Sequence, residues 1–379
     1  MKIKNTRAIN EKILSCVEQR EYDRFISAAF VLPISSGAMR FSDEKKLTEL
    51  AEQFLERAQN DGAVYTKDEA LLAAMVMALV RKYSAKVDPK YEILYEAITR
   101  NGKIYHEGEL ASDPFLSRIW LGGEMAGHKS FSNQSYQPYE LFFYDTPTEI
   151  GGGIKVPKIA AFDTGYNYPY LAENNAGLSG LTPYMINTMK DPIEKAEGSV
   201  LNLGCGMGYF AYMAHLKDNV SKVTVVEKDA DLVELFQRHL LPQFEQPEKI
   251  EVIHEDPHTY LDTLEDGTYD FCFANLWSNN MDLVPYLDTK KVCRKFHKMK
   301  QSFWIEDSLT DMLTNMAFVT ILEAFHENIG LAKPNPEGVS EEGKQVLGIL
   351  RELLEKEEIS RPDHIDWYLD PVNLLKMMR

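Results

Sequence analysis

The stretch that decides the fold spans residues 199–210 and reads Ser-Val-Leu-Asn-Leu-Gly-Cys-Gly-Met-Gly-Tyr-Phe. Residues 199–203 predict a short buried strand, and the apolar residues from Phe210 onward predict a helix. Three alternating glycines join the two elements: Gly204, Gly206 and Gly208. Glycines supply bare backbone and positive φ angles where a ligand lies against a helix N-terminus. The stretch therefore predicts a ligand-binding loop, with a purely structural glycine turn as the alternative.

The spacing of these glycines argues against a dinucleotide as the ligand. A dinucleotide fingerprint requires G-x-G-x-x-G, because its third glycine allows the helix to pack closely on the strand. In this chain Tyr209 occupies the position of that third glycine, and the order is G-x-G-x-G. The loop therefore favours a nucleotide-like ligand without a pyrophosphate.

Later segments predict the remaining strands of a parallel sheet: residues 222–229, 250–256, 269–277 and 302–306. The first of these ends near Glu227, where a carboxylate can accept hydrogen bonds from both hydroxyls of a ribose. The next ends at Asp256, and the one after it carries Asn275. Because ligands of open α/β sheets bind outside the carboxyl ends of the strands, we expect these three side chains to meet beside the glycine loop.

This loop and the strands and acids after it resemble the class I S-adenosylmethionine-dependent methyltransferases, over about residues 180–330. We therefore expect an α/β fold, with a Rossmann-like methyltransferase sheet preceded by a helical domain and a small β-hairpin element. The resemblance implies S-adenosylmethionine as the cofactor, and it places Asp256 where an acid accepts from the adenine amino group. The cofactor-binding residues implied in this way are Asn202, Gly204, Cys205, Gly206, Gly208, Glu227, Lys228, Asp256, Pro257 and Asn275.

Asn202 departs from the family pattern, in which the residue two before the first glycine is usually acidic and binds the methionine amino group. An amide oxygen can still accept a hydrogen bond, but the lost charge costs about 1–3 kcal/mol. Weaker cofactor binding, or a different ligand, is the alternative that this residue leaves open.

Asn275 and Trp277 are the residues that we expect to face the acceptor. Base N-methyltransferases carry Asn or Asp near Asn275, but the prolines of their N-P-P-[YF] motif are absent here. The order of elements before the sheet also resembles the spermidine synthase group, in which a catalytic Asp near this position helps deprotonate the attacking amine. An amide cannot do this, which favours methyl transfer over aminopropyl transfer. Trp277 either stacks on the substrate or covers the edge of the sheet.

Aromatic residues are concentrated in residues 166–170, shortly before the glycine strand. This run either forms a lid, with Tyr170 over the substrate, or packs within a hairpin, and the sequence leaves both open. Strand-like residues 138–144 and 158–162 flank a glycine-rich loop and predict a β-hairpin or a small sheet. Thr182 followed by proline predicts the start of the helix that leads into the glycine strand.

The outer parts of the chain have helical patterns. Ser42 is expected to cap one helix, and the capping box at residues 66–69 opens a buried helix that ends at Tyr83. Residues 281–300 predict a helix whose basic end is a solvated face or a docking patch for an anionic partner. No strands are evident for a sixth and seventh position of the sheet. The expected units are helical 1–112, a β-hairpin and aromatic lid segment 113–178, a methyltransferase-like Rossmann domain 179–330 and a helical extension 331–379.

The composition limits the partners of the chain, which has 379 residues and a net charge of −17. Such a charge argues against a general nucleic-acid binder, whose affinity comes from neutralising phosphates. The four cysteines are dispersed, as in reduced core thiols, and no apolar run is long enough to span a membrane. We expect a cytoplasmic protein with a small-molecule substrate, no membrane partner, and a possible homo-oligomer formed through the N-terminal helical domain.

His254 and His258 lie on either side of Asp256, but no third ligand follows at a useful spacing, so we expect no metal. The sequence therefore predicts an S-adenosylmethionine-dependent methyltransferase that acts on an unidentified, small-molecule acceptor. The alternatives are an aminopropyltransferase and a non-catalytic protein that binds S-adenosylmethionine or a nucleotide.

Overall fold

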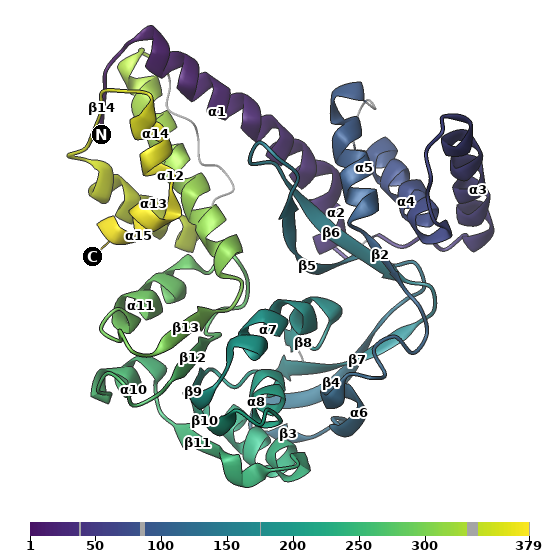
Figure 1. Ribbon diagram of the computed structural model, residues 1–379, viewed down its shortest axis with the longest axis vertical. Helices are drawn as coiled ribbons and strands as arrows, with labels where there is room; N and C mark the ends of the chain where they lie inside the picture. The colour runs from purple at the N-terminus through teal and green to yellow at the C-terminus, as the bar shows by residue number, and fades with distance from the viewer. Residues whose placement is uncertain (38, 84–87, 175, 332–339, 379) are drawn as a thin grey trace.

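The computed structural model describes residues 1–37, 39–83, 88–174, 176–331 and 340–378. Its centre is a parallel sheet in the order β11-β10-β9-β12-β13 (Figure 1). The strands are β9 Gly198–Leu203, β10 Val220–Glu227, β11 Ile250–His254, β12 Phe271–Ala274 and β13 Lys300–Phe303. The predicted Rossmann-like sheet is therefore confirmed. Among the described residues it has no sixth or seventh strand, as the sequence led us to expect.

The order of the strands reverses at β9, which lies between β10 and β12. Such a reversal opens a crevice at the carboxyl edge of the sheet, where ligands of this fold class bind. The helices of this part are α7 Pro183–Lys195, α8 Tyr209–His215, α9 Ala230–Leu235, α10 Pro257–Thr263, α11 Leu283–Cys293 and α12 Glu306–Asn328.

Several predicted boundaries in this region were wrong, including the following two. The helix expected over 281–300 ends at Cys293, and Lys300 already belongs to β13. The strand expected to reach Glu306 ends at Phe303, because Ile305 adopts a left-handed conformation, with φ of 49°, from which α12 starts. That turn redirects the chain from the sheet edge into a long helix.

The N-terminal helices form one cluster, to which α1 contributes only its C-terminal end (Figure 1). They are α1 Arg7–Ile26, α2 Leu32–Ser35, α3 Glu44–Asn60, α4 Lys67–Tyr83 and α5 Glu92–Arg100. The capping box is confirmed, since Thr66 and Glu69 each accept a hydrogen bond from the other's backbone N–H. Asp43, and not the predicted Ser42, caps α3, because its carboxylate accepts from the backbone N–H of Lys46.

The β region is larger than one hairpin. The predicted hairpin is present as antiparallel β5 and β6, with β2 on the far edge of β6, and β3, β4, β7 and β8 form a second, antiparallel sheet. The short helix α6 Pro114–Arg118 precedes this sheet. The strands are β2 Lys103–Tyr105, β3 Met125–Ala126, β4 Lys129–Tyr136, β5 Phe142–Glu149, β6 Lys155–Phe162, β7 Tyr166–Glu173 and β8 Ala176–Gly180.

The C-terminal elements lie against the first half of α1, where both chain ends meet (Figure 1). They are α13 Glu341–Leu354, β14 Glu358–Ile359, α14 Asp363–Tyr368 and α15 Pro371–Met377, and β14 pairs in parallel with β1 Lys2–Ile3. The division into units at residues 112, 178 and 330 stays a prediction, and buried clusters join residues on both sides of the first and last of these positions. None of the helices in the described part of the chain combines the length and apolar character that a membrane span requires.

Candidate functional site

The strand register brings three of the predicted site residues to one level of the sheet edge. Leu203 at the end of β9 lies opposite Val226 of β10 and Ala274 of β12. The next residue of each strand is therefore Gly204, Glu227 or Asn275. Because these three residues lie at the same level, segments that are far apart in the sequence can form one site.

The three glycines of the loop have different roles. All have positive φ, at 83° for Gly204, 50° for Gly206 and 76° for Gly208. A Cβ atom on Gly204 would collide with the backbone oxygen of Asn275, and one on Gly208 would press against Phe236. A Cβ on Gly206 would meet nothing within 4 Å. Gly206 therefore presents bare backbone to open space, as a ligand cradle requires.

Glu227 fixes the shape of the loop. Its side chain is buried, and its two carboxylate oxygens accept from the backbone N–H groups of Cys205, at 3.0 Å, and Asp229, at 2.9 Å. Burial, with the nearby Glu227 charge, raises the pKa of the Cys205 thiol well above its usual value. Cys205 is thus a buried neutral thiol, and Glu227 is an acceptor held in place beside the loop.

Asn202 also holds the loop. Its side chain is 1% exposed and its Nδ2 donates to the carbonyl oxygen of Gly204 at 2.9 Å. A carboxylate at this position could not donate this bond. The amide that departs from the family pattern therefore has a structural partner in this chain.

Asp256, expected on the adenine side, and Pro257 follow the exposed end of β11, whereas Lys228 follows β10. Asp256 caps α10 by accepting from the backbone N–H groups of His258 and Thr259, and these bonds lower the pKa of its carboxyl. Pro257 is buried as the first residue of that helix, and Lys228 is exposed. Asp256 reaches the predicted edge of the sheet, with part of its acceptor capacity used in the cap.

Tyr209, at the position of the absent third glycine, anchors the preceding segment to the sheet domain. It is 3% exposed, and its hydroxyl donates to Asp113 at 2.8 Å. Its ring packs against Phe115 of α6, with centroids 5.5 Å apart. A glycine could make neither contact. The tyrosine that replaces the third glycine therefore allows α6 to pack against the start of α8.

A small cavity of about 30 Å³ adjoins the glycine loop, which is room for about one or two water molecules. Besides Asn202, Asn275 and the loop, it is lined by residues that sequence reasoning missed, among them Ser179 beside β7, and Leu181 and Met185 at the start of α7. No local motif marks these residues, because only the return of β8 over the loop brings them there.

The sheet that contains β8 is fastened beside the loop. Lys129 of β4 is buried and forms ion pairs with Glu173, at 2.9 Å, and with Asp229, at 3.2 Å. The backbone N–H of His128 donates to Asp231 at 2.9 Å. These contacts join the second β-sheet to the start of α9, immediately after Glu227.

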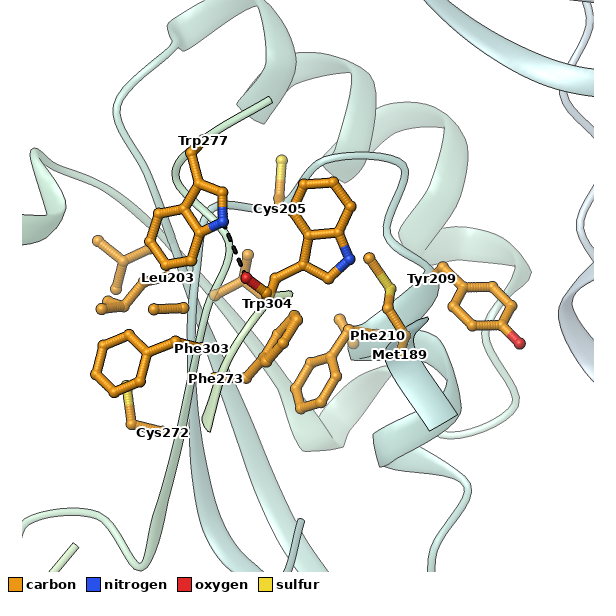
Figure 2. Close-up of a cluster of buried hydrophobic side chains, with 14 of the residues drawn as sticks. Met189, Leu203, Cys205, Tyr209, Phe210, Cys272, Phe273, Trp277, Phe303 and Trp304 are labelled. Carbon is orange, nitrogen blue, oxygen red and sulfur yellow. Dashed lines mark hydrogen bonds between the residues drawn. The ribbon is translucent and has the colours of Figure 1, made fainter. Parts of the chain in front are cut away.

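Trp277 lies in the core, which fits its packing alternative. It is 6% exposed, and its ring lies beside Tyr286. Its Nε1–H donates to the carbonyl oxygen of Trp304 at 3.0 Å, and Phe303 lies on the same side of the core (Figure 2). The indole ring therefore makes its contacts with other core residues in this structure. These contacts support the packing alternative for Trp277, and its contact with substrate stays a prediction.

Tyr170 lies on β7 and its hydroxyl end packs over Gly177 of β8, where any side chain would displace it. It does not line the glycine-loop cavity. His254 and His258 point to different partners, the carbonyl oxygen of Lys228 and the hydroxyl of Thr289. No group of three possible metal ligands occurs in the part of the chain that the structure describes.

Residues 181–275 match the family model described as Methyltransferase small domain. The match starts at α7 and ends at Asn275, so it includes the glycine loop and Glu227. The predicted resemblance to the class I S-adenosylmethionine-dependent methyltransferases is therefore confirmed for this segment, which is similar to a methyltransferase domain and has a Rossmann-like fold. No curated protein matches the chain.

Solved structures with partial similarity include three of interest. A conserved hypothetical protein from Streptococcus pyogenes is 22% identical over 24% of this chain and 51% of its own, with a TM-score of 0.19. The PRMT1 enzyme-prozyme heterotetrameric complex with AdoHcy from Trypanosoma brucei is 19% identical, and the match covers 31% of this chain and 37% of that chain, with a TM-score of 0.25. Spermidine synthase from Thermotoga maritima is 12% identical, and the match covers 51% of this chain and 71% of that chain, with a TM-score of 0.29. The chain thus spans about half of the first protein and just over a third of the second.

Proposed function

We propose that the chain binds S-adenosylmethionine at the glycine loop and transfers its methyl group to a small-molecule acceptor. The observation that carries this proposal is the meeting of three features at one level of the sheet edge. These are the positive-φ loop 204–208, the buried Glu227 carboxylate and Asn275, all within the segment that matches a methyltransferase domain.

The residues present fit the cofactor by their chemistry. Glu227 offers carboxylate oxygens for ribose hydroxyls, and Gly206 leaves its backbone open to a ligand. When bound, the cofactor supplies a methyl group activated on a sulfonium, so the protein's task is to bind, orient and exclude water. Because the cavity beside the loop measures only about 30 Å³, we expect Ser179 and Leu181 to move outward on binding.

A calorimetric titration tests the proposal. We expect micromolar binding of S-adenosylmethionine and S-adenosylhomocysteine, weaker binding of decarboxylated S-adenosylmethionine, and none of NAD. A preference for the decarboxylated form would contradict methyl transfer and favour aminopropyl transfer. Binding of none of them would contradict the proposed cofactor site. A cytoplasmic location and assembly through the N-terminal helices stay predictions that this experiment does not address.

A further inference from the structure

A second, larger cavity of about 480 Å³ lies between the N-terminal helices, β5 and the start of α7. This volume lies within the range of about 300–1,000 Å³ that is usual for small-molecule sites. Its walls are mostly apolar and aromatic, and Tyr136, Phe142, Phe143 and Tyr184 are among the lining residues. The methyltransferase segment contributes Thr182 and Tyr184 to it, so the cavity lies where that domain meets the parts that precede it.

Two stretches of chain join this cavity to the one at the glycine loop. At the start of α7, Leu181 and Met185 line the loop cavity, whereas Thr182 and Tyr184 line the larger one. After β12, Asn275 lines the loop cavity, and Asn280, on the same connection, lines the larger one. The first turn of α7 and the connection after β12 therefore each border both cavities. An acceptor in the larger cavity would be separated from a cofactor at the loop by these two segments.

The charges of the larger cavity are of one sign. Glu140 and Asp145 line it, and no lysine, arginine or histidine is among its described lining residues. Asp145 is paired with Lys158 at 2.9 Å. Glu140 accepts from the backbone N–H of Gln137 at 2.8 Å, and within the described chain no cationic side chain lies at ion-pair distance from it. Arg40 lies opposite Glu140 in an isolated antiparallel bridge but forms no ion pair with it, so a bound cation would supply a counterion to this partly buried carboxylate.

The aromatic walls suit the same kind of ligand. Tyr136 stacks on Phe142, with centroids 4.3 Å apart, and it lies close to Glu140. Tyr184 also lines the cavity, and its hydroxyl is a hydrogen-bond donor at neutral pH. Aromatic faces attract cations and stack on flat apolar groups.

We infer that this cavity is the acceptor pocket and takes an arylalkylamine, an inference that rests on the methyltransferase function proposed above. The ring of the amine packs against Tyr136 and Phe143, and its ammonium group faces Glu140. A polyamine fits less well, because the cavity offers one carboxylate without a counterion and otherwise mostly apolar walls.

The experiment compares tyramine with its neutral analogue tyrosol, its anionic analogue 4-hydroxyphenylacetate, and putrescine, by titration of the full chain. We expect tyramine to bind at least tenfold more tightly than the other three. Glu140→Gln should abolish the preference for tyramine over tyrosol, since it removes the charge and keeps an acceptor for Gln137. Glu52→Gln, an equal charge change at an exposed residue of α3, should leave the preference intact.

A second variant does not depend on Glu140. Ser35 is exposed at the rim of the cavity, and Ser35→Trp should weaken tyramine binding by narrowing the entrance. Equal affinity of tyramine and tyrosol, tighter binding of putrescine, or an unchanged preference in Glu140→Gln would overturn the inference. S-adenosylmethionine titrated on the same samples separates the two proposals. If it binds and tyramine does not, only the acceptor pocket is wrong; if tyramine binds and it does not, the methyltransferase function is wrong.

Discussion

The Glu227 carboxylate accepts the backbone N–H of Cys205 at 3.0 Å, so the acid at the end of β10 holds the glycine loop at the end of β9. The same carboxylate bonds the backbone N–H of Asp229 and thereby joins the loop to the start of α9. One side chain thus shapes the site and offers acceptor oxygens to a ligand.

Replacing Glu227 with alanine should weaken S-adenosylmethionine binding at least tenfold, about 1.4 kcal/mol. The variant should also lose stability, because the buried N–H of Cys205 is left without its acceptor, which costs about 1–3 kcal/mol. Affinity is therefore measured by calorimetry on folded samples, with the exposed Glu248→Ala as the matched control. Unchanged affinity in folded Glu227→Ala would remove Glu227 from the cofactor site.

Asn202→Asp restores the acidic residue of the family pattern, yet we expect it to destabilise this protein. The Asn202 amide donates to the Gly204 carbonyl, and a carboxylate would instead bring two acceptors together in a buried site. The expected loss is about 1–3 kcal/mol in the free energy of unfolding, measured by urea denaturation. A variant as stable as the parent, with tighter cofactor binding, would show that the bond to Gly204 matters little.

Two glycine substitutions should separate folding from binding. Gly204→Ala should impair folding, because its Cβ would collide with the Asn275 backbone oxygen. Gly206→Ala faces open space and should cost only about 1–2 kcal/mol for its left-handed backbone. The second variant should fold and bind S-adenosylmethionine at least tenfold more weakly, because the new methyl group intrudes on the cradle. Circular dichroism and calorimetry measure the two effects, and normal binding by Gly206→Ala would place the ligand elsewhere.

Trp277→Phe should affect stability and leave cofactor affinity unchanged. The indole N–H bonds the Trp304 carbonyl oxygen inside the core, and phenylalanine keeps most of the ring volume while losing that bond. We expect a loss of about 1–3 kcal/mol in unfolding experiments. A large drop in S-adenosylmethionine or acceptor binding without loss of stability would favour the substrate-facing role.

His106 should make the N-terminal half more stable at low pH. Its ring nitrogens lie 2.7 Å from Asp163 and 3.0 Å from Asp68, and the hydrogen bonds to Asp163 and then Asp68 raise the pKa of the imidazole above 6.5. Because the pKa of His106 is higher in the folded state than in the unfolded state, its contribution to stability is complete below about pH 6.5. That contribution is lost as the pH rises through the pKa of the folded state. The melting temperature of the parent should exceed that of His106→Gln most at pH 5.5, with the difference shrinking toward pH 8.5. A difference independent of pH would contradict the ion-pair account.

Local signals predicted most of the central elements. Residues 199–208 gave β9 and the glycine loop, Thr182 with its following proline gave the start of α7, and the capping box gave the start of α4. Helix ends were less predictable. The end of α11 at Cys293 depends on the chain turning into β13, and nothing in the local pattern of charged residues marks that turn.

The sequence by itself determined the parallel sheet, the loop geometry and the level at which Glu227 and Asn275 emerge, because strand hydrophobicity and glycine conformation are local properties. Only the tertiary structure decided what surrounds that edge. It buried Trp277 against Trp304, gave Asn202 the Gly204 carbonyl as a partner, and brought Glu140 and Tyr184 to one cavity. These relationships join segments distant in sequence or depend on burial, and the packing that creates them leaves no periodic pattern in the chain.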